Sequence, residues 1–416
     1  MVKTIKLNCG TTVIMEKTDY VQSAALGIWI KAGASDETDD VSGVSHYIEH
    51  MMFKGTEKRN AKEIASDVDR IGGVINAFTG KEATCYYIKT LSTNIYQGAE
   101  ILLDMLTDSK FDPEEMDKER QVIYEEIKMI KDSPDDDVYD TISELVSSGN
   151  PLGRSILGTP ESLAGIDRNT MVGYLQDKYA RDSIVIAIAG NFDEQRIIDL
   201  FEGKLMKLRE NKLVEPVDIK PYKQTFDVKV RDIEQTHLCL ATPAVSLADD
   251  KYYSFVLMNS ILGGSMSSRL FQNIREEKGL AYSVCSMNVF SSYWGFFSVY
   301  AGVAHEKAKD TIEAVKYELE LLKNKGVTAD ELAMAKEQVK SSYIFGLENI
   351  NSRMFSLGKN QLLLGRVFDS SDVLNSFDKV TQDDILEAAS IIGDHRNYCG
   401  AAVTGKDFDL EGMIKG

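Results

Sequence analysis

The pattern of apolar and polar residues predicts short strands and longer helices that follow one another irregularly along the chain. Apolar residues alternate with polar ones, or run together, in segments bounded by glycine, which is typical of strands. Between these segments the apolar spacing becomes helical, with Ser42 and Asp112 as candidate N-caps of two helices. The predicted strands cover residues 12–15, 23–30, 74–78 and 83–91, and the predicted helices cover residues 42–53, 61–71 and 113–131.

Two parts of the chain resemble each other. The segment Arg181–Phe192 ends the first part with an arginine, a strand, a glycine and an acidic turn, and Arg396–Phe408 ends the second in the same way. The long helix also recurs, because Phe111–Met116 aligns with Val327–Leu332 at an offset of 216 residues. We therefore expect an α+β fold built from two similar units. The predicted units cover residues 1–210 and 222–416, and a polar linker that contains proline covers residues 211–221.

Length, charge and cysteine content exclude several classes of protein. The chain has 416 residues, 43% of them apolar, and one packed core rarely exceeds about 250–300 residues, so at least two cores are expected. The net charge of −18 repels phosphate backbones and anionic lipids, which argues against nucleic-acid and membrane partners and allows attraction of basic peptides. Five scattered cysteines indicate reduced thiols. With no signal-peptide pattern and no apolar run that could span a bilayer, we expect a cytoplasmic protein.

The strongest chemical signal is the segment His46-Tyr47-Ile48-Glu49-His50. A random chain with 5 histidines and 65 acidic residues among 416 would contain His-x-x-acid-His only about 0.01 times. On a helix, positions i, i+3 and i+4 share one face, so the three polar side chains converge. Two imidazoles at this spacing can bind zinc, and the glutamate between them can contact a bound water. The alternative is a helix with incidental histidines.

A catalytic zinc needs a third protein ligand and keeps its fourth position open. The helix predicted at 113–131 offers Glu119, Glu125 and Glu126. Glu119 and Glu126 are seven residues apart and share a face, whereas Glu125 points elsewhere. Taken alone, this helix would be interpreted as acidic and solvated. Spacing by itself does not choose among these residues.

The block His46–Thr56 resembles the active-site helix of the pitrilysin/insulinase-type zinc peptidases. Within them the resemblance is greatest to the mitochondrial processing peptidase and its bacterial relatives. In that family the third ligand is a glutamate 76 residues after the second histidine, which implies Glu126 as the ligand and Glu119 as the acid supporting it. The resemblance extends through residues 76–79, 119–126, 151–158 and 275–282, in both halves of the chain.

The second unit has lost the metal-binding residue types. At the 216-residue offset, Ala335 and Ser342 occupy the positions of Glu119 and Glu126. Phe255, Met258 and Asn259 align with His46, Glu49 and His50. We therefore expect one Zn²⁺ per chain, bound by His46, His50 and Glu126 of the first unit.

The second unit is expected to contribute Arg275 and Tyr282. In the resembled family this pair reaches the active site, where it binds the substrate backbone and stabilises the oxyanion. A tyrosine hydroxyl is a neutral donor, and a guanidinium group is a fixed cationic fork, so both roles are chemically sensible. Without the resemblance, Arg275 would be interpreted as a surface charge and Tyr282 as a core aromatic.

The segment Val74–Gly80 matches the edge strand on which family members bind extended peptides. A free strand edge offers unpaired N–H and C=O groups to another strand. Asn76, Ala77 and Phe78 are therefore the predicted substrate-binding residues. An ordinary strand is the alternative.

These observations predict a zinc metalloendopeptidase that hydrolyses unfolded or extended peptides, with Glu49 as general base. The resemblance implies that each unit is a mostly antiparallel sheet covered by helices, and that four units surround an enclosed chamber. One chain supplies two units, so we expect a homodimer or a heterodimer with a similar chain. The alternative is a non-catalytic structural or peptide-binding subunit of a processing-peptidase-like complex.

Overall fold

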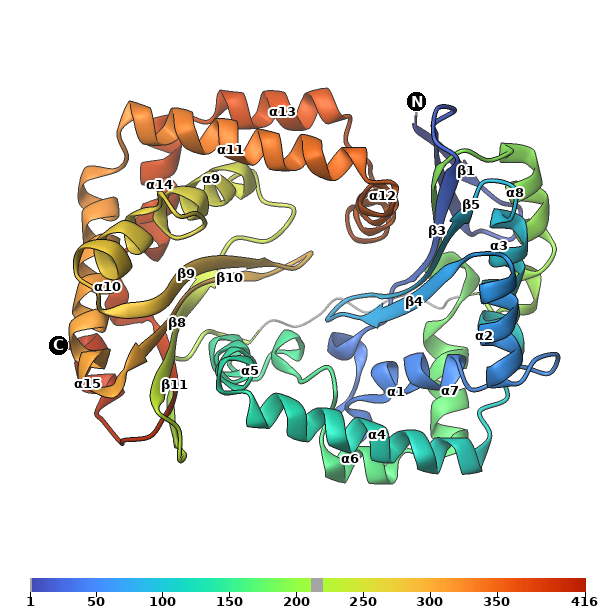
Figure 1. Cartoon of the computed structure of the whole chain (residues 1–416), viewed down its shortest axis with the longest axis horizontal. Coiled ribbons are helices and arrows are strands. Elements are labelled where there is room, and N and C mark those ends of the chain that lie inside the picture. The colour runs from blue at the N-terminus through green and yellow to red at the C-terminus, as the bar shows by residue number, and fades with distance from the viewer. Residues whose placement is uncertain (1, 211–219) are drawn as a thin grey trace. The chain divides into compact units, whose positions relative to one another are not determined.

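The computed structural model describes residues 2–210 and 220–416. These residues form two compact units, each a sheet covered by helices (Figure 1). The first unit comprises residues 2–127, 154–210 and 345–367, and the second comprises residues 128–153, 220–344 and 368–416. Most of the predicted linker at 211–221, residues 211–219, lies outside the described residues.

The sheet of the first unit has six strands, and β4 lies at one edge of it. Every neighbouring pair is antiparallel except β2 with β6. Across its centre, Leu26 pairs with Ile88 on one side and with Ile188 on the other. In spatial order the strands are β1 (Val2–Lys6), β2 (Thr12–Lys17), β6 (Ile184–Gly190), β3 (Ser23–Ile30), β5 (Thr84–Leu91) and β4 (Val74–Thr79).

The sheet of the second unit repeats this topology with five strands. Its one parallel pair, β7 with β11, corresponds to the pair β2 and β6. Strand β9 takes the edge position that β4 has in the first unit. The order is β7 (Phe226–Val230), β11 (Cys399–Thr404), β8 (Gln235–Ala244), β10 (Gly295–Ala304) and β9 (Ala281–Phe290).

Helices cover the main core of each unit, where apolar side chains of sheet and helices pack together. In Figure 1, α9, α10 and α14 lie on one side of the second sheet. The helices that belong wholly or mostly to the first unit are α1 (Val44–Met52), α2 (Ala61–Arg70), α3 (Ile95–Asp108), α4 (Pro113–Asp132), α6 (Pro160–Gly165), α7 (Arg168–Lys178), α8 (Glu194–Glu202) and α12 (Ile350–Leu364). Those of the second are α5 (Pro134–Ser147), α9 (Tyr252–Leu262), α10 (Ala308–Lys325), α11 (Ala329–Glu348), α13 (Ser370–Lys379), α14 (Gln382–Ile392) and α15 (Leu410–Lys415).

The two halves of the sequence exchange one helix each. Helix α5 (Pro134–Ser147), which follows α4, packs on β8 and β11 of the second unit. Helix α12 (Ile350–Leu364), which follows α11, packs on β3 and β6 of the first unit, so Met354 and Leu357 are buried against that sheet. A division of the sequence at residues 210 and 222 takes no account of this exchange, because each exchanged helix is far in sequence from the strands that it covers.

The structure confirms the predicted strands and helices to within one or two residues at their ends. Helices α4 and α11 are both 20 residues long and begin 216 residues apart, at Pro113 and Ala329, as the repeat predicts. All five cysteines are free. None of the helices in the described part of the chain is both long and apolar enough to cross a membrane.

Candidate metal centre and active site

Helix α1 carries His46, Glu49 and His50, and its first turn is held by a residue outside the helix. The N-cap is Gly43, not the predicted Ser42, and a glycine has no side chain to cap with. Instead the buried carboxylate of Glu37 accepts hydrogen bonds from the N–H groups of Gly43 at 2.6 Å and Ser45 at 2.8 Å. A carboxylate at a helix N-terminus satisfies free N–H groups and complements the helix dipole. The prediction of Ser42 was wrong because the cap comes from tertiary structure.

The backbone also packs unusually closely at this end of α1. Gly43 has a φ of +89°, and a Cβ atom there would lie 2.5 Å from the carbonyl oxygen of Leu157. Gly158, with a φ of +71°, packs against Ser42 and Gly43 in the same way. Two glycines are therefore needed for this contact, since any side chain would push the loop away from the helix. The contact fixes where the metal-site helix begins.

Helix α4 is fixed to α1 by contacts beside the site. The Tyr47 hydroxyl donates to the carbonyl oxygen of Met116, and the guanidinium group of Arg120 lies over the Tyr47 ring. Nδ1 of His50 lies 3.1 Å from Oε2 of Glu119, and Nζ of Lys54 lies 2.5 Å from Oε1 of Glu119. Glu119 is itself buried, so these two partners compensate for its lost hydration.

Three side chains converge with the geometry of a metal site. Nε2 of His46 and Nε2 of His50 lie 3.7 and 3.6 Å from Oε2 of Glu126, and one ligand atom from each of the three residues lies within 4.8 Å of the others. Zinc binds histidine nitrogen and carboxylate oxygen at about 2.0–2.2 Å, which puts tetrahedral ligands about 3.3–3.5 Å apart. The three donors therefore fit Zn²⁺. The group contains no fourth ligand from the described residues, which is the arrangement of a catalytic site.

The protonation states suit metal binding. Burial, and secondly the charge of His50, lowers the pKa of His46 to about 4. At neutral pH His46 is therefore uncharged, which is the form that binds a metal through a ring nitrogen. Its Nδ1 atom is buried and has no hydrogen-bond partner among the described residues, in contrast to Nδ1 of His50.

Glu49 lies on the same face of α1, and its carboxylate contacts the sheet. Oγ1 of Thr79, at the end of β4, donates a 2.5 Å hydrogen bond to Oε2 of Glu49. Burial raises the pKa of Glu49, and the Thr79 hydrogen bond and the charge of His50 oppose this rise. A carboxylate with a raised pKa is a better proton acceptor near neutral pH.

The predicted peptide-binding residues lie on β4, at the edge of the sheet. Asn76 is exposed and its Oδ1 accepts a hydrogen bond from the N–H group of Ala77. Phe78, 38% exposed, packs edge-on against Trp29 and Phe355. Among the described strands, β5 is the one partner of β4, so the opposite edge of β4 is free of described strand partners, as the prediction of an edge strand requires.

Arg275 and Tyr282 lie together in the second unit. Arg275 belongs to a π-helical segment, Phe271–Glu277, and Tyr282 is the second residue of β9. The Arg275 guanidinium lies 4.8 Å from the ring centroid of Phe271 and 5.6 Å from that of Tyr282. Tyr282 is 77% exposed and is not the core aromatic that its sequence context alone suggests. The approach of this pair to the metal residues stays a prediction.

In the second unit, Phe255, Asn259 and Ser342 occupy the positions of the three metal ligands. Phe255, which aligns with His46, is fully buried in the core of the second unit, and so is Met258, which aligns with Glu49. Among the described residues, His46, His50 and Glu126 are the only group with metal-site geometry. The loss of ligand types in the second unit is therefore accompanied by a loss of the site itself.

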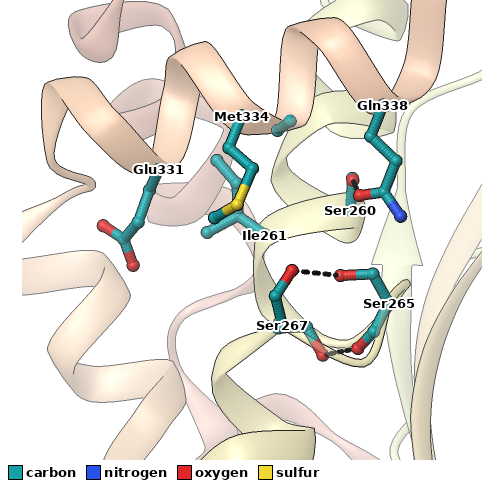
Figure 2. Close-up of a pocket in the computed structure, with 9 residues that line it drawn as sticks. Ser260, Ile261, Ser265, Ser267, Glu331, Met334 and Gln338 are labelled. Carbon is teal, nitrogen blue, oxygen red and sulfur yellow. Dashed lines mark hydrogen bonds between the residues drawn. The ribbon is translucent and has the colours of Figure 1, made fainter. Parts of the chain in front are cut away.

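A small polar pocket lies between α9 and α11 (Figure 2). Oγ of Ser260 donates to Oε1 of Gln338 at 3.1 Å. The one carboxylate of the pocket, Glu331, is paired through both oxygens with Arg269 at 2.7 and 2.8 Å. The lining consists of Ser260, Ile261, Ser265, Ser267, Ser268, Glu331, Met334, Ala335 and Gln338. A lining with no imidazole or thiol, and with its carboxylate neutralised, gives no support for a second metal site.

The sequence analysis missed two residues that shape the site, Glu37 and Thr79. Neither lies in the helix that it contacts. Glu37 is 6 and 8 residues from its partners Gly43 and Ser45, and Thr79 is 30 residues from Glu49. Glu37 could have been suspected only from the absence of a capping side chain at Gly43. Thr79 lies in the predicted edge segment, one residue beyond the three predicted substrate-binding residues, and no spacing rule links it to Glu49.

Comparison with known proteins identifies the family. Residues 12–160 match the family model described as insulinase (peptidase family M16), and residues 165–339 match the model of the peptidase M16 inactive domain. The first match contains the metal group, and the second covers a large part of the second unit, which lacks metal ligands. Two similar sheet-and-helix units, with one described metal group in the first, are the arrangement expected of this class of metallopeptidase. The chain belongs to the insulinase family, peptidase family M16.

Several bacterial proteins are similar along nearly the whole chain. YmxG of Bacillus subtilis, an uncharacterized zinc protease, is 40% identical over 383 residues, 91% of this chain and 93% of the relative. An uncharacterized zinc protease of Streptomyces coelicolor is 35% identical over 388 residues, 91% of this chain and 84% of the relative.

Solved structures share the fold at lower identity. A protease from Helicobacter pylori superposes with a TM-score of 0.90 at 21% identity, covering 97% of this chain and 99% of that one. A peptidase M16 inactive domain structure from Pseudomonas fluorescens superposes with a TM-score of 0.91 at 18% identity, covering 98% of each chain.

Proposed function

We propose that this chain is a zinc metalloendopeptidase that hydrolyses extended peptides. The observation that carries the proposal is the convergence of His46, His50 and Glu126, with Glu49 beside them on α1 and without a fourth ligand in the described group. The relatives named zinc proteases support the metal assignment. We propose one Zn²⁺ per chain, since the second unit lacks the ligand types.

A bound Zn²⁺ would polarise the scissile carbonyl and acidify a water molecule. Glu49 accepts the proton of the attacking water and then delivers it to the nitrogen of the leaving amine. His46 and His50 hold the metal as neutral imidazoles, and Glu119 fixes the ring of His50 through Nδ1. The raised pKa of Glu49 lets it accept a proton near neutral pH and give it up again.

The free edge of β4 is the proposed binding surface for the peptide. Backbone N–H and C=O groups along Asn76, Ala77 and Phe78 would pair with the substrate as an additional strand. Backbone pairing selects for an extended chain and tolerates many sequences, so unfolded peptides are the expected substrates. A folded protein would have to open before it could pair.

The remaining parts of the proposal rest on the family resemblance. Tyr282 would donate to the developing oxyanion and Arg275 would bind substrate carbonyls. The exposure of Tyr282 and the position of the Arg275 guanidinium over the rings of Phe271 and Tyr282 suit these roles. A second chain, identical or similar, would complete an enclosed chamber of four units.

The test uses the full chain and a quenched, unstructured peptide. Cleavage should require zinc, stop with a chelator and return when zinc is restored. Glu49→Gln should retain zinc, measured by atomic absorption, and lose about 10²–10⁴-fold in kcat. A zinc-loaded wild-type chain that binds the peptide without cleaving it would instead indicate the non-catalytic subunit.

A further inference from the structure

Thr79 is the one described residue whose side chain is hydrogen-bonded to Glu49. The O···O distance of 2.5 Å is typical of a hydroxyl that donates to an ionised carboxylate, which is a strong class of hydrogen bond. Only Oε2 of Glu49 is engaged, so Oε1 is left to accept a proton. The single strong donor therefore fixes the carboxylate through Oε2 and leaves Oε1 free to act as the base.

The position of Thr79 on β4 links this hydrogen bond to the peptide-binding strand. Alternate residues of a strand face opposite sides of the sheet. Ile75 and Ala77 pack on the core side together with α1, and Thr79 continues that series. The strand whose free edge would pair with the peptide thus holds the base through its last residue.

On the opposite face of β4, aromatic contacts hold the strand in place. Phe78 contacts Trp29 and Phe355 at ring-centroid distances of 5.5 and 5.8 Å. Phe355 also packs on Tyr87 of the neighbouring strand at 4.8 Å. Edge-to-face pairs of this kind each add a modest stabilisation to simple burial. Helix α12 therefore holds the strand from which Thr79 reaches Glu49.

We infer that Thr79 is a positioning residue that fixes the carboxylate of Glu49 for proton transfer and couples it to the peptide-binding strand. The inference rests on the proposed function. A glutamate side chain has three rotatable bonds. Loss of its one hydrogen-bond partner among the described residues would let the carboxylate leave the orientation that reaches the attacking water. The effect should fall on turnover rather than on zinc or peptide binding.

Three variants separate positioning from simple structural support. Thr79→Val removes the hydroxyl and keeps the branched shape, whereas Thr79→Ser keeps the hydroxyl. Thr90→Val is the matched control, because Thr90 is a buried residue of β5 whose hydroxyl donates to the carbonyl oxygen of Ile71. All three are purified as full chains and loaded with zinc.

The expected result is a selective loss of turnover. Thr79→Val should lower kcat about tenfold, because it loses one strong hydrogen bond to the base. Its KM, its zinc affinity by competition with a chelating dye, and its peptide affinity in a Glu49→Gln background should equal those of the parent chain. Thr79→Ser should recover most of the lost kcat, and Thr90→Val should keep the wild-type kcat whatever its stability.

Other outcomes overturn the inference. Wild-type kcat in Thr79→Val, or an equal loss in Thr79→Ser, would show that the hydroxyl does not position the base. A similar loss of kcat in Thr90→Val would show that Thr79 gives only general structural support. If the wild-type chain itself binds zinc and cleaves no peptide, the proposed function fails first, and the positioning role fails with it.

Discussion

Nδ1 of His50 lies 3.1 Å from Oε2 of Glu119, while Nε2 of the same ring faces Glu126 at 3.6 Å. One imidazole thus joins two carboxylates of α4 through its two nitrogens. Nδ1 of His46 has no such partner in the described part of the chain. The two histidines are therefore supported differently, since a specific acid orients His50 and burial on α1 holds His46.

This difference predicts that Glu119 contributes to zinc affinity without being a ligand. Glu119→Gln should weaken zinc binding about 10–100-fold, because partners that orient a histidine ligand typically contribute that much. Glu115→Gln is the matched control, since Glu115 on the same helix also pairs with a lysine, Lys118 at 2.5 Å, and is no part of the metal group. Competition titration with a chromophoric chelator measures both variants, and equal affinities would remove Glu119 from this role.

The assignment of Glu126 as the third ligand predicts a larger effect. Loss of a supporting residue is expected to lower zinc affinity about 10–100-fold. Glu126→Gln should lower it by more than that. Glu125→Gln, one residue away and exposed, should leave zinc affinity unchanged. The same titration compares them directly. If the two variants retained zinc equally well, Glu126 would not be a ligand.

Tyr282→Phe tests whether the second unit takes part in catalysis. Because Tyr282 is 77% exposed, loss of its hydroxyl should leave the free energy of unfolding unchanged. If the hydroxyl stabilises the oxyanion, kcat should fall about 10²–10³-fold with little change in KM. Tyr20→Phe, another exposed tyrosine, is the control. Steady-state kinetics with equal zinc content decide the matter, and a full kcat would confine catalysis to the first unit.

Arg275→Lys should behave differently from Tyr282→Phe. The planar guanidinium group lies over the rings of Phe271 and Tyr282, and an ammonium group cannot reproduce its fork of donors. We therefore expect a raised KM for the peptide with a smaller change in kcat. An unchanged KM would argue against substrate binding by Arg275.

The pair Arg269 and Glu331 predicts a pH dependence of stability in the second unit. Hydrogen bonds from Arg269 lower the pKa of Glu331 from 4.5 to about 2. The folded state therefore favours the ionised form, so the pair stabilises the fold fully above about pH 4.5, and this stabilisation is lost as the pH falls towards 2. Because the pair is partly exposed, we expect a contribution of only about 1 kcal/mol at pH 7.

Urea unfolding of Glu331→Gln and the wild type at pH 7, 4 and 3 measures this contribution. The difference in unfolding free energy should be largest at pH 7 and shrink as the pH falls. Glu387→Gln is the control, because Glu387 is an exposed acid whose partner, Lys251, lies 3.3 Å away. A difference that stays constant with pH would exclude titration of Glu331 as its cause.

Local pattern was sufficient to predict some of the strands and helices, and the face of α1 that carries His46, Glu49 and His50. The alternation of β4, the bounds of α2 and α4, and the 216-residue repeat are properties of residues close in sequence or of whole segments, and they match the structure. The convergence of His46, Glu49 and His50 also follows from helical spacing alone. The choice of Glu126 among the glutamates of α4 required the family resemblance, because residues on a helix face do not reveal what that face meets.

The sequence by itself determined the residue types available for chemistry and their arrangement within each element. Tertiary structure alone decided that Glu37 caps α1, that Thr79 reaches Glu49, that α5 covers the sheet of the second unit and that α12 covers the sheet of the first. These contacts join residues on separate elements, and periodicity reports only which way a side chain points within its own helix or strand. Which partner it meets depends on how the elements pack, and that is set by burial over the whole unit rather than by any local spacing.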